Sequence, residues 1–324
     1  MDIVTLLLGI GLAVYGAQLL VDGGVAVASR FGIPTLVIGS TVVAFGTSMP
    51  EFTVNIQSAL ADKTDLALGN ILGSNLFNIA AIVGIVAMIT PLAVSEDSRS
   101  KDFPMCLIAA IMVGVAGNQI YLDGVNFHEI MLSDGIVFLL FFWLFMRYLY
   151  TEAAVGAAHQ EHAKTKSDPE HPVGGMSMGR SIVYILAGLA GLVFGGDFIV
   201  DGATGIAKGF GLSDRVIGLA IVGPGTSIPE LVAAIVAALK KQVDMVIGNV
   251  LGSNILNIFF TLGVTALIQP VPLDLSLNTV ILTNIGITAA LVLYTRFSTR
   301  SIGRPVGALL VIAYVAYLTN SIMA

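Results

Sequence analysis

Two six-residue stretches, GTSMPE at 46–51 and GTSIPE at 225–230, combine side chains that suit cation binding. Each places a glutamate within an apolar run, where an ionised carboxylate is costly unless a positive charge compensates it. On a helix, the threonine and serine four and three positions earlier share a face with that glutamate. These six residues are Thr47, Ser48, Glu51, Thr226, Ser227 and Glu230. Hard cations prefer oxygen ligands, so the motifs predict a cation site built in two halves.

A second pair of motifs, GNILGSNLFNI at 69–79 and GNVLGSNILNI at 248–258, adds neutral oxygen ligands. In each copy a serine and an asparagine lie one helical turn apart. These residues are Ser74, Asn78, Ser253 and Asn257. Each copy also has two glycines four residues apart, a spacing that allows helices to pack closely. They are Gly69, Gly73, Gly248 and Gly252.

The motifs of the first half recur in the second after a shift of 179 residues. The same shift aligns Asp22 with Asp201, and Pro91 with Pro270. The chain is therefore an internal duplication. None of the four motifs contains Lys or Arg, so the glutamates have no partner there for an internal ion pair.

The composition indicates a membrane protein, because 56% of the 324 residues are hydrophobic and only 11% are charged. Ten apolar runs are long enough to cross a bilayer as helices. They lie near 3–21, 33–60, 66–90, 103–121, 130–150, 181–200, 211–239, 244–268, 277–295 and 303–322. Five spans per copy reverse the direction of the second copy. We therefore predict an all-α integral membrane protein with ten transmembrane helices in two inverted five-helix repeats, with helices 2 and 7 broken at their motifs.

A polar stretch at 151–180 separates the repeat at 1–150 from the repeat at 181–324, and its composition is typical of a mobile linker. One set of alternate loops holds twelve Lys and Arg residues and the other holds three. Because basic residues are retained in the cytoplasm, this count predicts a cytoplasmic linker and two external termini. The expected location is the inner (cytoplasmic) membrane, with a multi-pass topology.

The paired motifs resemble the two alpha-repeats of the cation/calcium exchanger superfamily, in its sodium/calcium exchanger branch. The resemblance covers the whole ten-helix layout. It implies that Glu51 and Glu230 are the central acidic ligands shared by calcium and sodium. It further implies a set of neutral ligands, namely Thr47, Ser48, Ser74, Asn78, Thr226, Ser227, Ser253 and Asn257.

These features predict a secondary antiporter that exchanges sodium for calcium by alternating access and extrudes calcium. Two buried carboxylates demand cationic compensation, which one calcium ion or several sodium ions supply in turn. A proton-driven calcium exchanger and a passive cation channel are the alternatives. An enzyme is not expected, because no activated nucleophile accompanies the glutamates. The expected partners are calcium and sodium as transported ions and the lipid bilayer, without a cofactor or nucleic acid; the oligomeric state is left open.

Two departures from the family pattern affect the expected site. Some relatives have an aspartate at one of the positions held here by Asn78 and Asn257, so this cage is limited to two formal negative charges. The second repeat also reads IVGPGTS where the first reads VVAFGTS. Pro224 removes a backbone donor just before the motif, which predicts a wider unwound segment in that half.

Overall fold

The computed structural model describes residues 2–61, 64–119, 128–164, 176–212, 214–297 and 301–323. Within these ranges eight helices are long and apolar enough to cross a membrane. Two shorter apolar helices, Thr35–Thr47 and Ile228–Leu239, belong to the two interrupted spans. The prediction of ten spans is confirmed, because the eight long helices and the two interrupted ones follow the expected order.

The first repeat contains one long helix, one broken helix and three further spans. Its elements are α1 (Asp2–Phe31), α2 (Thr35–Ile38), η1 (Gly39–Val43), α3 (Ala44–Thr47), α4 (Met49–Leu60), α5 (Thr64–Leu76), η2 (Phe77–Ile82), α6 (Val83–Ile89), β1 (Leu92–Ala93), η3 (Ser98–Asp102), α7 (Phe103–Gly117), β2 (Glu129–Ile130) and α9 (Leu132–Lys164). Helix α9 runs on to Lys164, so the first part of the stretch expected to be a linker is helical.

The second repeat follows the same order. Its elements are α10 (Met178–Gly209), α11 (Asp214–Ile217), η4 (Gly218–Val222), α12 (Gly223–Gly225), α13 (Ile228–Leu239), α14 (Val243–Leu256), η5 (Asn257–Leu262), α15 (Gly263–Ile268), β3 (Val271–Pro272), η6 (Leu275–Leu277), α16 (Asn278–Phe297), β4 (Ser301–Ile302) and α17 (Arg304–Met323). Residues 165–175 of the expected linker lie outside the described residues, and its last three residues, 178–180, are already part of helix α10.

The second span of each repeat is broken where the sequence places its proline. Pro50 and Pro229 lie in the first turn of α4 and α13, where a missing N–H is tolerated but the preceding helix cannot continue. Only Ser48 separates α3 from α4, whereas Thr226 and Ser227 both separate α12 from α13. The wider interruption expected in the second half is therefore present.

Each motif helix also contains a π-helical segment. Segments η1 and η4 lie just before the motifs at 46–51 and 225–230, where the helices break. Segments η2 and η5 lie within the two helices that carry the second pair of motifs, at 69–79 and 248–258, which we call the partner motifs. The π-helix is rare and occurs mostly at functional sites, because its wider turn leaves the regular backbone hydrogen-bond pattern. Both halves share these segments, so Pro224 in one half is not their cause.

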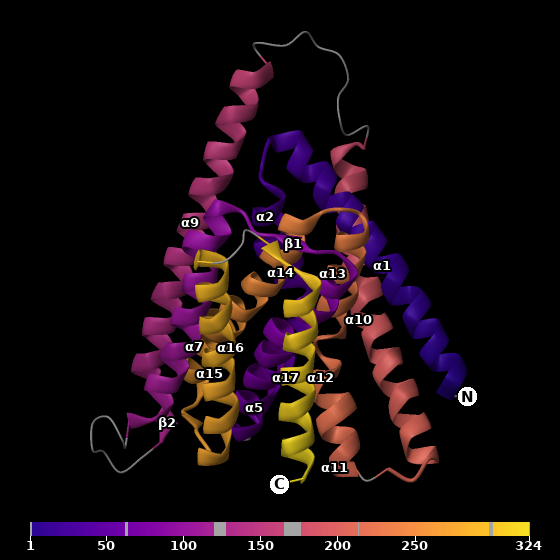
Figure 1. Cartoon of the computed structure of the whole chain (residues 1–324), viewed down its shortest axis with the longest axis vertical. Helices are drawn as coiled ribbons and strands as arrows, with labels where there is room; N and C mark the ends of the chain where they lie inside the picture. The colour runs from indigo at the N-terminus through magenta and orange to yellow at the C-terminus, as the bar shows by residue number, and fades with distance from the viewer. Residues whose placement is uncertain are drawn as a thin grey trace.

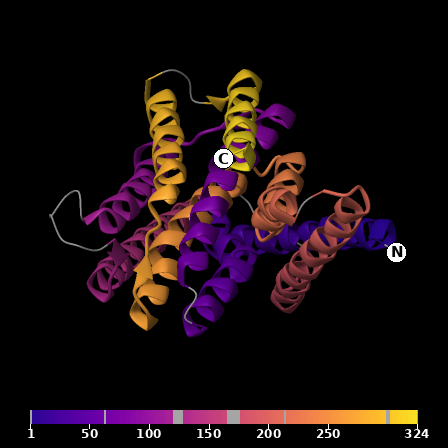
Figure 2. The ribbon, with the colours of Figure 1, turned by 90° about the horizontal axis from the view of Figure 1, so that it is seen from below.

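The two partner motif helices form the centre of the bundle (Figure 1). The spans Ala67–Ile89 and Val243–Ile268 are the most buried, while Arg304–Met323 is the least buried. Two short antiparallel pairings join the halves: β1 pairs with β4, and β2 pairs with β3. Seen from below, α1 and α10 lie together at one side of the bundle (Figure 2).

Helices α1 and α10 run side by side in opposite directions along one edge of the bundle (Figure 1). Their contact depends on glycine, because a Cβ added at Gly16 would lie 2.8 Å from the carbonyl oxygen of Gly188. A Cβ added at Gly188 would be equally crowded, because it would lie 2.7 Å from the carbonyl oxygen of Gly16. Small residues let the two backbones approach this closely.

Both chain ends lie at one end of the bundle, and α9 ends and α10 begins at the other (Figure 1). We call the first the terminal face and the second the linker face. This arrangement follows from the odd number of spans in each repeat.

Candidate cation-binding site

The two helix breaks place Glu51 and Glu230 in the first turns of α4 and α13. Both side chains are 0% exposed. The N-terminal end of a helix carries partial positive charge from its unpaired N–H groups, which favours a carboxylate there. That effect is far smaller than the cost of burying an ion, so the pair still requires a positive charge.

The hydroxyls next to the breaks contact the glutamate of the opposite repeat. Ser48 Oγ donates to Glu230 Oε1 at 2.9 Å, and Ser227 Oγ donates to Glu51 Oε1 at 2.8 Å. All four side chains are buried. The two half-sites are thus joined into one by reciprocal hydrogen bonds, which each occupy one oxygen of a carboxylate.

The motif threonines lie next to these carboxylates and also contact the partner motifs. Thr226 Oγ1 lies 3.3 Å from Ser74 Oγ and 3.5 Å from Asn70 Oδ1. Thr47 Oγ1 lies 3.3 Å from Asn249 Oδ1. Asn70 and Asn249 were not among the site residues predicted from the sequence. The shift of 179 residues aligns them with each other, and this repetition was the clue that could have identified them.

Four asparagines connect the partner motifs across the centre. Asn78 Nδ2 donates to Asn254 Oδ1 at 3.1 Å, and Asn257 Nδ2 donates to Asn75 Oδ1 at 3.0 Å. On a regular helix Asn75 and Asn254 lie about 100° from the face that carries the expected serine and asparagine ligands. The structure brings all four into one network because the helices that carry them cross at the centre.

Five buried oxygens of the expected site residues have no hydrogen-bond partner in the part of the chain that the structure describes. They are Glu51 Oε2, Glu230 Oε2, Asn78 Oδ1, Asn257 Oδ1 and Ser253 Oγ. Leaving buried polar atoms unpaired is costly, so native structures rarely do it without a reason. Four of these atoms can only accept, and a hydroxyl oxygen also coordinates cations. This set of oxygen ligands therefore fits a hard cation.

The described ion pairs do not compensate the two glutamates. Each of those pairs joins a Lys or Arg to an acidic residue outside the motifs. Two negative charges in a low-dielectric setting repel one another strongly. The cage formed by Glu51, Glu230 and the neutral oxygens around them is thus electrostatically incomplete without a bound positive charge.

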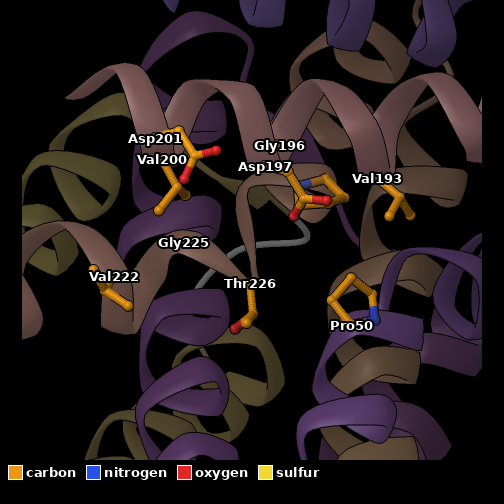
Figure 3. Close-up of a pocket in the computed structure, with 10 residues that line it drawn as sticks. Pro50, Val193, Gly196, Asp197, Val200, Asp201, Val222, Gly225 and Thr226 are labelled. Atoms are coloured by element: carbon orange, nitrogen blue, oxygen red, sulfur yellow. The ribbon is translucent and has the colours of Figure 1, made fainter. Parts of the chain in front are cut away.

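A cavity of about 310 Å³ lies beside this cage (Figure 3). Asp197 and Asp201 of α10 form one wall, and Thr226 and Pro50 lie across from them. The α10 segment after these aspartates packs against the start of α1, since a Cβ at Gly202 would lie 2.8 Å from the carbonyl oxygen of Asp2. The cavity is therefore on the side of the cage nearer the terminal face.

An ion pair occupies the corresponding position near the linker face. Lys240 Nζ, at the end of α13, lies 2.5 Å from Asp22 Oδ1 on α1 and 3.3 Å from the carbonyl oxygen of Gln18. Asp22 matches Asp201 in the duplication, but the residue that matches Lys240 is Ala61. This ion pair therefore has no equivalent at the cavity, and the two faces differ in sequence as well as in structure.

Inverted repeats around a buried oxygen cage, with a cavity beside it, are the arrangement of a secondary cation transporter and not of an enzyme. The family described as "Sodium/calcium exchanger protein" matches residues 1–151 and 180–323. The chain belongs to the sodium/calcium exchanger family.

Several relatives align along almost the whole chain. Inner membrane protein YrbG of Escherichia coli is 34% identical over 97% of this chain and 94% of its own. The sodium/calcium exchanger MaX1 of Methanosarcina acetivorans is 29% identical, with 97% of this chain and 96% of that protein covered. A solved structure of the sodium-calcium exchanger NCX_Mj superimposes with a TM-score of 0.80 at 31% identity, and covers 98% of both chains.

Proposed function

We propose that this cation antiporter exchanges sodium for calcium across the cytoplasmic membrane and extrudes calcium by alternating access. The observation that supports this most strongly is the set of five unpaired buried oxygens that includes one from each glutamate. A cage with two carboxylates and several neutral oxygens suits a divalent ion that prefers oxygen ligands.

We assign the transported ions to the residues that the motifs single out. Glu51 and Glu230 are the shared acidic ligands. The neutral ligands are Thr47, Ser48, Ser74, Asn78, Thr226, Ser227, Ser253 and Asn257. The hydroxyl groups support sodium as the coupling ion, because sodium needs neutral oxygens whereas a proton needs only the carboxylate.

Exchange follows from the charge of the cage. One calcium ion neutralises both carboxylates, and so do two sodium ions, so the two kinds of ion compete for the same oxygens. An empty cage with two negative charges crosses the low-dielectric centre of the membrane only at high cost. Binding of one ion is therefore required before the other is returned, which couples the two flows.

The orientation rests on the distribution of basic residues. The sequence assigns twelve Lys and Arg residues to the connections and span ends expected on the linker side, and three to those expected on the terminal side. Basic loops remain in the cytoplasm, so the linker face is cytoplasmic and the cavity beside Asp197 and Asp201 faces outward. Sodium that enters from outside then reaches the cage through this cavity, while calcium leaves by the same route.

The decisive experiment is calcium uptake into proteoliposomes that contain the purified protein. Vesicles are loaded with sodium or with acidic buffer and diluted into calcium without that ion. Uptake that requires internal sodium is the expected result. Uptake driven by a pH gradient alone would instead identify a calcium/proton exchanger, and calcium flux without any counter-ion would identify a channel.

Removing the ion pair at the linker face is expected to shift the balance between the two access states. Lys240→Ala removes a half-exposed ion pair between the end of α13 and Asp22 of α1. The repeat mates of these two residues, Ala61 and Asp201, cannot form such a pair. Such exposed pairs contribute about 0.2–1 kcal/mol, so the population of the state with the outer cavity should fall at most about fivefold. The measurement is the rate at which a maleimide labels Val200→Cys, which lines the cavity, in a Cys106→Ala background.

The matched control for this prediction is Lys101→Ala, which removes another ion pair, formed with Glu152 at 2.5 Å. Labelling of Val200→Cys should not change in that variant, because the pair does not join α1 to α13. Equal labelling rates in Lys240→Ala and the unmodified background would contradict the prediction.

A further inference from the structure

Asn75 and Asn254 form a reciprocal pair where α5 and α14 meet. Asn75 Nδ2 donates to the carbonyl oxygen of Asn254 at 3.1 Å, and Asn254 Nδ2 donates to the carbonyl oxygen of Asn75 at 3.0 Å. Both residues are 1% exposed. Each is the repeat mate of the other, so one contact occurs twice about the symmetry axis of the duplication.

These backbone contacts determine which way each amide points. A carbonyl oxygen can only accept, so Nδ2 of Asn75 and of Asn254 must be directed at it. Their Oδ1 atoms are then left to accept from Asn257 Nδ2 at 3.0 Å and from Asn78 Nδ2 at 3.1 Å. If the Asn78 or Asn257 amide were reversed, two oxygens would face each other without a proton between them.

We call Asn75 and Asn254 the inner pair, and Asn78 and Asn257 the outer pair. The orientation of the inner pair determines which end of each outer amide stays unpaired. Oδ1 of Asn78 and Oδ1 of Asn257 are buried without a partner among the described residues, whereas their Nδ2 atoms are both occupied. An amide that presented Nδ2 to a cation would repel it with two N–H dipoles. The inner pair thus leaves Oδ1 as the one wholly unpaired polar atom of each outer amide in the described structure.

We infer that Asn75 and Asn254 are positioning residues that set the amide oxygens of Asn78 and Asn257 as ligands for the transported cation. This rests on the proposed function, which makes the outer pair ligands of calcium and sodium. The inner pair does not touch the ion. It raises cation affinity by removing the orientation in which the outer amides oppose binding.

The test is a double-mutant cycle on calcium binding, measured by isothermal titration with the purified full chain in detergent. Asn254→Ala removes the acceptor that orients Asn78, and the calcium dissociation constant is expected to rise about tenfold. Asn78→Ala should weaken binding to a similar extent. Combining the two should cost no more than Asn78→Ala alone, because Asn254 acts through Asn78.

A purely structural role for Asn254 predicts a different outcome, with two independent losses that multiply. Asn118→Ala is the matched control, since Asn118 and Asn278 exchange amide hydrogen bonds of 2.8 and 2.9 Å between α7 and α16. It should lower the thermal midpoint as Asn254→Ala does, but leave the calcium dissociation constant unchanged. If Asn254→Ala fails to fold, Asn75→Ala with Asn257→Ala completes the same cycle in the other half.

Two negative results have distinct meanings. Absence of calcium binding by the unmodified protein would overturn the proposed function and this inference with it. Normal calcium binding by Asn254→Ala, or a multiplicative loss in the double variant, would overturn the inference alone.

Discussion

Glu51→Gln and Glu230→Gln are each expected to abolish calcium exchange. Either change leaves one carboxylate to balance a divalent ion in a buried cage. Removing one member of a buried charged pair costs about 3–5 kcal/mol, so transport should fall by at least about a hundredfold. Sodium-dependent calcium uptake into proteoliposomes measures this directly.

The fold should survive both substitutions. Glutamine has the same shape and keeps an oxygen that can accept from Ser227 or Ser48, which occupy one carboxylate oxygen each. It also removes the repulsion between two buried charges, so the thermal midpoint without calcium should stay constant or rise. Glu96→Gln, at a 64% exposed side chain, is the control that keeps transport. Full transport by either buried variant would contradict the assigned site.

Gly252→Ala is expected to lower both the thermal midpoint and transport, although its repeat mate Gly73 tolerates the same change. A Cβ at Gly252 would lie 2.7 Å from Ser40 Cα, so α14 and η1 would have to separate. Overpacking of this kind typically costs about 1–3 kcal/mol. At Gly73 nothing lies within 4 Å of the added atom. Alanine there should be neutral or slightly stabilising, because it favours helix.

Thermal unfolding followed in detergent, with uptake measured in parallel, compares the two variants. The same pattern should hold one turn earlier, because the space beside Gly69 is open while a Cβ at Gly248 would collide with the carbonyl oxygen of Leu36. Equal loss of stability in Gly73→Ala and Gly252→Ala would show that the two halves pack alike in solution, and would refute this asymmetry.

The contrast between these glycines has a structural cause. Helix α14 packs closely on α2 and η1 of the first broken span. Among the described residues no atom lies within 4 Å of a Cβ added at Gly69 or Gly73 of α5, and the cavity lies between α10 and the second broken span. The two motifs, which match at eight of eleven residues, thus have different surroundings in the two halves.

Hydropathy and the repeated motifs were enough to predict the membrane class, the ten spans, the inverted duplication and the positions of the two helix breaks. These properties are local. Hydropathy depends on a window of about 20 residues, and a proline in the interior of a helix removes a backbone donor and clashes with the preceding turn, so it breaks or kinks the helix there. The proposed site also rests on local evidence, because a glutamate in an apolar run is costly regardless of its neighbours.

Only the tertiary structure decided which groups meet. Sequence reasoning placed Ser48 on one helical face with Glu51, whereas Ser48 donates to Glu230 of the other repeat because the helix breaks at that serine. The role of Asn75 depends on the crossing of two helices that are far apart in the chain. A duplicated sequence specifies the same contacts twice, but a transporter that is open on one face must break that symmetry. Which half packs closely and which half borders the cavity depends on contacts between the repeats, and no local sequence pattern contains that information.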